Sequence, residues 1–227
     1  DQRVYLVQTR GKSEAGIAGA SLDVAVESAR LLRPLTDEEL ADLNVIHSGT
    51  HGREAPMGLA VVTGGVLHCV DVGTVRIYNH GEIDLKGHIS GCVNLFQHSR
   101  AAIRGSGVVY AMGDSTVSVV GKVKVQAVHR SIVTVNDKCT VECHNEVKVT
   151  LNGESTAKAY GGRILAKENS TVLIMEEGVS VHAMGNAVVT FPAEMGKKLC
   201  LTREGQAVLH PVGAPPISTG TGLNGRE

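Results

Sequence analysis

The sequence contains few aromatic residues: no tryptophan, two phenylalanines and four tyrosines among 227 residues. Proteins that bind single-stranded nucleic acids or sugars by stacking need flat rings on their surface, so this composition disfavours both functions. The chain also lacks an excess of charge of either sign, with a formal net charge of −1. A global electrostatic attraction to nucleic acid or to acidic membranes is therefore not expected.

Long apolar runs and a disulfide framework are missing as well. No apolar segment approaches the roughly 20 residues that span a bilayer, so we expect no membrane span. The odd number of cysteines and the absence of CxxC pairs disfavour a set of disulfides and a zinc site. This usage favours small buried thiols in a reducing cytoplasm. The five are Cys69, Cys92, Cys139, Cys143 and Cys200.

An eight-residue apolar repeat dominates the middle of the chain. Every eighth residue from Val61 to Val189 is apolar, seventeen times in succession. Four residues later, glycine, asparagine or aspartate stands at twelve of the seventeen positions. Alternating strands and tight corners require such a pattern, because a corner needs residues that tolerate positive φ. The repeat therefore predicts a parallel β-solenoid, a coil of short strands around one core.

The number of strands in each turn follows less directly. Two octads per turn would stack residues 16 apart, and three octads would stack residues 24 apart. At 16-residue spacing the outward positions hold mixed residue types. At 24-residue spacing four outward cations fall into one column: Arg76, Arg100, Lys124 and Lys148. We therefore expect three faces, about 24 residues per turn and a coil roughly 25–30 Å long. A change in which positions point inward predicts a corner adjustment near Gly87–Gly91.

Three regions are expected along the chain. Residues 1–56 do not follow the octad and predict a small α/β cap, with a helix over Ser21–Leu32 and a capping box at Thr36–Glu39 that opens a second short helix. Residues 57–191 form the solenoid. Residues 192–227 add one or two C-terminal strands, followed by a flexible tail from Pro211 onward.

The proposed column of cations is the first candidate site. Like charges stacked one strand apart repel each other, so a column of them suggests binding of a linear polyanion. We predict that Arg76, Arg100, Lys124 and Lys148, with Arg104 nearby, bind an anionic polymer. Ordinary solvated positions on an exposed strand are the alternative interpretation.

A second cluster contains His47, His51 and Glu54, which are weak candidates for metal ligands. An HxxxH spacing places both rings on one side only in a helix, and Gly49 and Gly52 disfavour a helix there. A polar capping loop is the favoured interpretation of this segment. We predict no catalytic residue and no cofactor.

Outward apolar residues gather late in the predicted coil: Ile132, Ile164, Val172, Ile174 and Val188. Contiguous exposed apolar area usually marks an interface, so we expect a homo-oligomer or an assembly partner.

The segment Gly81-Glu82-Ile83-Asp84-Leu85-Lys86-Gly87-His88-Ile89-Ser90-Gly91 alternates apolar and polar residues between glycines. It resembles the bactofilins, which are cytoskeletal β-solenoids. The resemblance implies a structural protein that assembles from many copies.

The sequence therefore favours a non-enzymatic β-solenoid that serves as a scaffold or binding module. It would bind an anionic polymer or belong to a larger phage-like or toxin-like assembly. The alternative is a carbohydrate-active β-helix enzyme, a lyase or hydrolase acting on an acidic polysaccharide, or an activity in the N-terminal cap. Short corners favour the first hypothesis, because such enzymes build their grooves from long loops.

Overall fold

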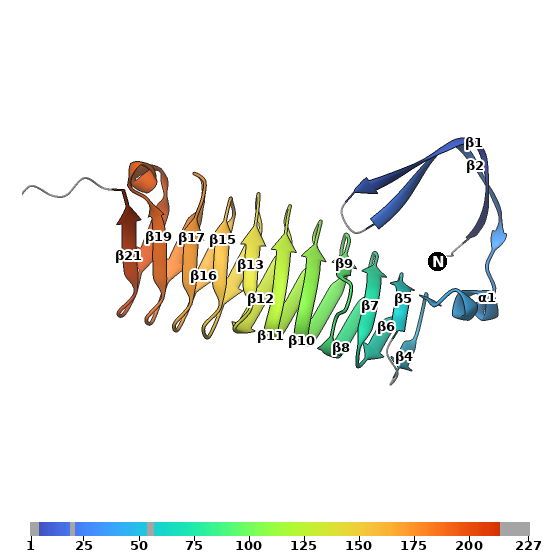
Figure 1. Ribbon diagram of the computed structural model, residues 1–227, viewed down its shortest axis with the longest axis horizontal. Helices are drawn as coiled ribbons and strands as arrows, with labels where there is room; N and C mark the ends of the chain where they lie inside the picture. The colour runs from blue at the N-terminus through green and yellow to red at the C-terminus, as the bar shows by residue number, and fades with distance from the viewer. Residues whose placement is uncertain (1–4, 19–20, 54–56, 214–227) are drawn as a thin grey trace, which may run out of the picture.

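A computed structural model describes residues 5–18, 21–53 and 57–213. Most of these residues form a parallel β-solenoid of about 10 turns around one core (Figure 1). Arg100 pairs with Thr116, and Thr116 pairs with Ile132, so each turn is two octads long. A turn therefore contains two strand segments and two corners, and the solenoid consists of two sheets.

Sheet I contains eleven strand segments: β3 (Val45–Ile46), β5 (Met57–Val62), β7 (Val72–Ile77), β9 (Val93–Leu95), the second halves of β10 (Arg100–Ala111) and β11 (Thr116–Ala127), β13 (Thr140–Cys143), β15 (Thr156–Ala159), β17 (Thr171–Ile174), β19 (Val188–Pro192) and β21 (Val208–Val212). Sheet II contains ten: β4 (Thr50–Arg53), β6 (Val66–Cys69), β8 (Glu82–His88), the first halves of β10 and β11, β12 (Ile132–Asp137), β14 (Lys148–Leu151), β16 (Arg163–Ala166), β18 (Ser180–Ala183) and β20 (Cys200–Arg203).

The expected three faces, and with them three octads per turn, are wrong. That expectation depended on outward cations, but solvated side chains are under no packing constraint to repeat from turn to turn. The octad itself is compatible with either number of strands per turn. At about 4.8 Å per strand spacing, ten turns make a coil roughly 48 Å long.

The core is a thin layer between the two sheets. Each strand usually contributes two inward side chains, as in β11 with Val117 and Val119 and in β12 with Val133 and Val135; all four are at most 1% exposed. Fourteen of the seventeen octad residues are buried in this way. A fully buried valine stabilises the fold by about 1.5–3 kcal/mol relative to an exposed one, so the layer supplies much of the stability.

The spacing between paired residues changes at a few corners. Glu82 pairs with Arg100, two positions beyond the usual pair of octads, which confirms the corner adjustment that the sequence indicates near Gly87–Gly91. Lys148 pairs with Arg163, one position short of that spacing. This shorter corner moves the inward positions by one, and Leu165 consequently points outward while Ile164 and Ala166 are buried.

The coil is longer at both ends than the predicted segment 57–191. β3 pairs with β5 and β4 pairs with β6, so the coil begins at Val45 and the loop predicted around residues 47–56 contains a strand. At the other end, β20 and β21 continue the two sheets, and a 3₁₀ helix, η1 (Ala193–Lys198), lies between β19 and β20. Both strands lie in the segment where the sequence predicts one or two C-terminal strands. Residues 214–227 of the predicted tail lie outside the described residues.

The N-terminal region contains a hairpin in place of the predicted helix over Ser21–Leu32. β1 (Tyr5–Ala18) and β2 (Ser21–Pro34) pair antiparallel in a sheet of their own (Figure 1). The segment Leu22–Val26 satisfies the two-residue period of a strand as well as a helical one, and the pairing with β1 selects the strand. The α/β cap predicted over residues 1–56 is therefore not confirmed: the expected first helix is a strand, and the coil itself already begins at Val45.

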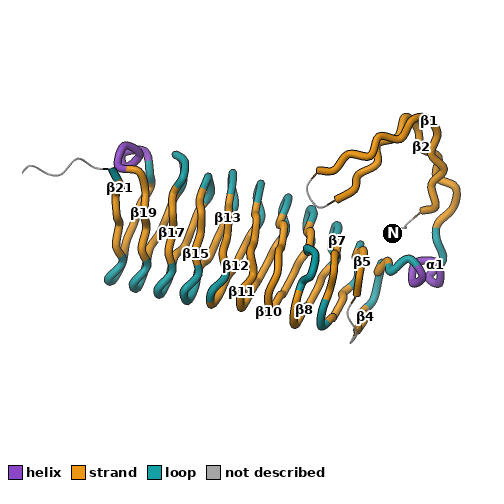
Figure 2. The backbone as a smooth tube through the Cα atoms, viewed as in Figure 1, coloured by secondary structure: helices purple, strands orange, loops and turns teal. Residues whose placement is uncertain are grey.

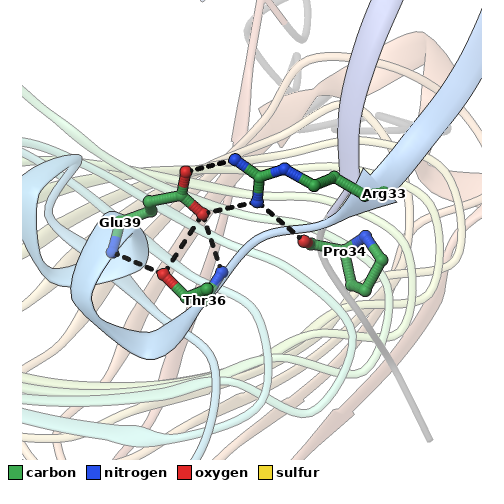
Figure 3. Close-up of polar contacts among 4 residues, drawn as sticks. All are labelled: Arg33, Pro34, Thr36 and Glu39. Atoms are coloured by element: carbon green, nitrogen blue, oxygen red, sulfur yellow. Dashed lines mark hydrogen bonds and ion pairs between the residues drawn. The ribbon is translucent and has the colours of Figure 1, made fainter.

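The second predicted helix is confirmed. α1 (Asp37–Asp42) begins after a capping box in which the Glu39 amide donates to the Thr36 hydroxyl and the Thr36 amide donates to the Glu39 carboxylate (Figure 3). The Arg33 guanidinium donates two hydrogen bonds to the same carboxylate and, with the Thr36 amide, lowers the pKa of Glu39 to about 2. Leu40 of α1 is buried beside β3, at the N-terminal end of the coil.

Candidate binding surfaces

The five predicted cations lie on both sheets rather than in one column. Arg76 and Lys124 project from sheet I, whereas Arg100, Arg104 and Lys148 project from sheet II. The stacked column is therefore wrong, because positions three octads apart fall on opposite sheets when a turn contains two octads. Whether these residues bind an anionic polymer stays a prediction.

On sheet I, neither cation has a cationic neighbour in register. Arg76 lies between Val61 and Asn94, and its Nε atom is buried with no hydrogen-bond partner within the described structure. Lys124 lies between Val108 and Thr140.

Sheet II carries a more continuous set of cations, which we call the basic face. Arg104 pairs in register with Lys86, and Lys148 pairs with Arg163, so two pairs of cations stand on neighbouring strands. All of its members are exposed: Lys86, Arg100, Arg104, Lys148 and Arg163. The sequence alone does not single out Lys86 and Arg163. Only the register of two octads per turn shows that they lie beside Arg104 and Lys148.

Carboxylates at the matching outward positions of sheet II stand on β8. Glu82 contacts Arg100, with 3.5 Å between Oε1 and Nη1, and Asp84 lies 3.4 Å from the His68 ring. Exposed ion pairs of this kind contribute about 0–1 kcal/mol and are weakened by salt. From β10 to β16 these positions hold cations, apolar residues and neutral polar residues, so none of them offsets the charges of Arg104, Lys148 and Arg163.

The outer surface of sheet I has a shallow hollow of about 320 Å³. Its lining includes the cations Lys124 and Lys158 together with the carboxylate of Glu142, which pairs in register with Lys158. The hydroxyls of Thr140 and Thr156 complete the polar groups. Its mixed charges disfavour it as an anion-binding site.

A second hollow follows the edge where sheet II turns into sheet I. It has a volume of about 490 Å³ and is lined by corner residues of four turns: Gly121, Lys122, Asp137, Lys138, Gly153, Glu154 and Asn169. Lys138 and Glu154 form an ion pair across it at 3.3 Å. Glycines, which have no side chain, stand at two of these corners.

The cysteines fit the predicted interpretation as small buried thiols in four of five cases, and Cys200 is the exposed exception. Burial, with a smaller contribution from Glu142, raises the pKa of Cys143 to about 12. Burial and the nearby Asp84 and Asp71 carboxylates raise the pKa of Cys69 to about 11. Thiols that resist ionisation are poor nucleophiles, so neither is suited to covalent catalysis.

Two of the three candidate metal ligands lie in the described residues, and each contacts a neighbouring oxygen. His47 Nδ1 lies 3.2 Å from the Thr63 hydroxyl, and His51 Nε2 lies 2.8 Å from the Ser48 carbonyl oxygen. Glu54 lies outside the described residues. Across the described parts of the chain, no three His, Cys, Asp or Glu side chains form a cluster that could hold a metal ion.

The predicted outward apolar patch does not form. Ile164, Val172 and Ile174 are at most 3% exposed, because the change in register by one position turns them into the core. Ile132 remains exposed at 44%, and Val188 is half-buried. Association between copies of the chain stays a prediction, without this patch to support it.

Among the described residues, no helix combines the length and the apolar character required to cross a bilayer. Comparison with protein-family models, with curated proteins and with solved structures gives no match.

Proposed function

We propose that the chain is a non-enzymatic β-solenoid rod and that its basic face binds an anionic polymer. The observation that carries this proposal is the placement of five exposed cations on the outward positions of sheet II, two pairs of them in direct register. A rigid strand ladder holds such charges at fixed intervals of about 4.8 Å. Fixed spacing lowers the entropy lost when an extended polyanion is bound.

The shape of the coil supports a binding role over an enzymatic one. The corners contain a few residues each, and in Figure 2 the loops form two narrow lines along the edges of the coil. Grooves in β-helix enzymes need longer loops to surround a substrate and shield it from water. Within the described coil, the longest such segment is the one around η1, near the C-terminal end.

The test is retention on immobilised heparin, a linear polyanion, with salt elution. The triple variant Arg100→Glu, Arg104→Glu and Lys148→Glu should elute at clearly lower salt than the wild type. Each lost contact with the polyanion means that one counterion fewer is released on binding, which lowers the affinity. The matched control is Lys122→Glu, Lys124→Glu and Lys158→Glu, which changes net charge by the same amount at exposed positions of sheet I and its edge.

The control should elute close to the wild type. Equal weakening by both variants would show attraction to overall charge and would overturn the assignment to the basic face. Unchanged retention of the first variant would overturn polymer binding at that face. Circular dichroism spectra of both variants verify that the coil is intact.

A further inference from the structure

Two histidines occupy the same position on successive corners, on the edge where sheet I turns into sheet II. Asn79 and Gln97 both have φ of 55°, and His80 and His98 directly follow them. The two imidazole rings are nearly parallel, at 10°, with centroids 5.6 Å apart. Both side chains are exposed to solvent.

The corners that carry the pair are held in place by their neighbours. Tyr78 and Phe96, two residues before each histidine, stack with ring centroids 4.7 Å apart. The Phe96 amide donates to the Ile77 carbonyl oxygen at 2.9 Å, which continues the ladder between the two turns. The relative position of His80 and His98 is therefore fixed by the fold rather than by the rings themselves.

The pair differs from the other histidines in having free nitrogens side by side. Six histidines have a ring nitrogen within 2.6–3.6 Å of a neighbouring oxygen: His47, His51, His68, His88, His144 and His182. Within the described residues, the side chains of His80 and His98 have no hydrogen bond or ion pair. Each ring therefore has a nitrogen lone pair available to an external ligand.

We propose that His80 and His98 form a two-nitrogen chelate for a divalent transition-metal ion such as Zn²⁺. With metal–nitrogen bonds of about 2.0–2.1 Å, two imidazoles on one tetrahedral ion have ring centres roughly 5 Å apart, close to the observed 5.6 Å. In the nearly parallel rings the in-plane lone pairs do not converge on one point, so binding of the ion requires the two exposed rings to turn about their Cβ–Cγ bonds. Imidazole nitrogen suits zinc, copper and nickel, whereas calcium and magnesium prefer oxygen. Water would complete the coordination.

Asp114 holds the equivalent position on the next turn, where it follows Gly113 at φ 71°. Its carboxylate accepts a hydrogen bond from Arg130 at 2.8 Å and is engaged in that ion pair. The site therefore has two protein ligands, and we expect an affinity in the micromolar range rather than that of a structural zinc site.

The test is a titration of the full chain with ZnCl₂ by calorimetry, with histidine side-chain NMR signals recorded in parallel. His98→Ala and His80→Ala should each weaken Zn²⁺ binding at least tenfold, and the signals of both rings should shift together in the wild type. The control is His129→Ala, an exposed histidine on the same edge without a histidine neighbour, and its affinity should equal that of the wild type.

Two outcomes would overturn the site: wild-type affinity in His98→Ala, or an equal loss in His129→Ala. A His80→Ala/His98→Ala double variant much weaker than either single variant would also contradict a chelate, since removal of one ligand already abolishes chelation. His98→Gln, which keeps a polar side chain beside Phe96, separates loss of the ligand from a change in the corner. MgCl₂ should give no shift of either ring, and equal shifts would contradict the assignment to a transition metal.

Discussion

At the scale of single residues, the bend between sheets II and I depends on a column of glycines. Gly87, Gly105 and Gly121 occupy equivalent positions on successive turns. Gly121 has φ of 113°, and a Cβ atom there would lie 2.4 Å from the Gly105 carbonyl oxygen. That contact is with backbone, which cannot move aside without breaking the strand ladder.

Gly121→Ala should therefore lower the free energy of unfolding by about 3 kcal/mol or more, from backbone strain and steric overlap together. The matched control is Gly58→Ala, where a Cβ atom would meet nothing within 4 Å. Its effect should stay within about 0.5–1 kcal/mol. Urea denaturation of both variants measures the difference, and similar midpoints would contradict the proposed role of the glycine column.

At the scale of strands, the shorter corner before β16 determines which residues enter the core. The tripeptide Tyr160-Gly161-Gly162 replaces the usual four-residue corner, and Ile164 takes the inward position that the octad assigns to Leu165. The next corner on that side, before β18, is longer, and Arg163 pairs with Ser180, one position beyond the usual pair of octads. From Val181 onward the octad positions point into the core again.

A pair of substitutions tests this register. Ile164→Asp should destabilise the protein by at least about 3 kcal/mol, because it places a charge between the two sheets. Leu165→Asp, at the neighbouring half-buried outward position, should cost about 1 kcal/mol or less. Thermal unfolding monitored by circular dichroism compares them, and a larger loss for Leu165→Asp would contradict the register.

The strand scale also shows how far the sequence could predict the fold. Inward residues such as Val117 and Val133 repeat because the core between the two sheets accepts only apolar side chains, so the solenoid itself was predictable. Outward residues such as Arg100 and Lys124 are exposed to solvent and repeat by no such rule, which is why the outward cations suggested a wrong number of faces. The basic face could not be assembled from the sequence until the register was known.

At the N-terminus, the sequence was ambiguous for a different reason. Leu22 and Val26 suit one side of a helix, yet Leu22, Val24 and Val26 also alternate as in a strand. Local pattern does not choose between the two, because the choice depends on pairing with β1, which is a longer-range contact. The capping box at Thr36 was predictable, since its donors and acceptors lie close together in the sequence.

At the scale of the whole molecule, each turn of the coil contacts only the turns on either side. Stability in such an array is a sum of terms within turns and between neighbours, so the terminal turns have one interface fewer. Amide hydrogen exchange should be slowest in the central strands β11–β14 and fastest in β3, β4 and β21. Mass spectrometry after deuterium exchange measures this gradient, and uniform protection along the coil would contradict it.

The repeating two-sheet turn has a consequence for how the molecule can vary. Duplicating or removing one two-octad unit from the regular region around β12 and β13 would leave the remaining inward side chains in equivalent environments. Such a change would alter only the reach of the rod, by about 4.8 Å for each unit. The length of this coil can therefore be changed in steps of one turn, by natural selection or by protein engineering.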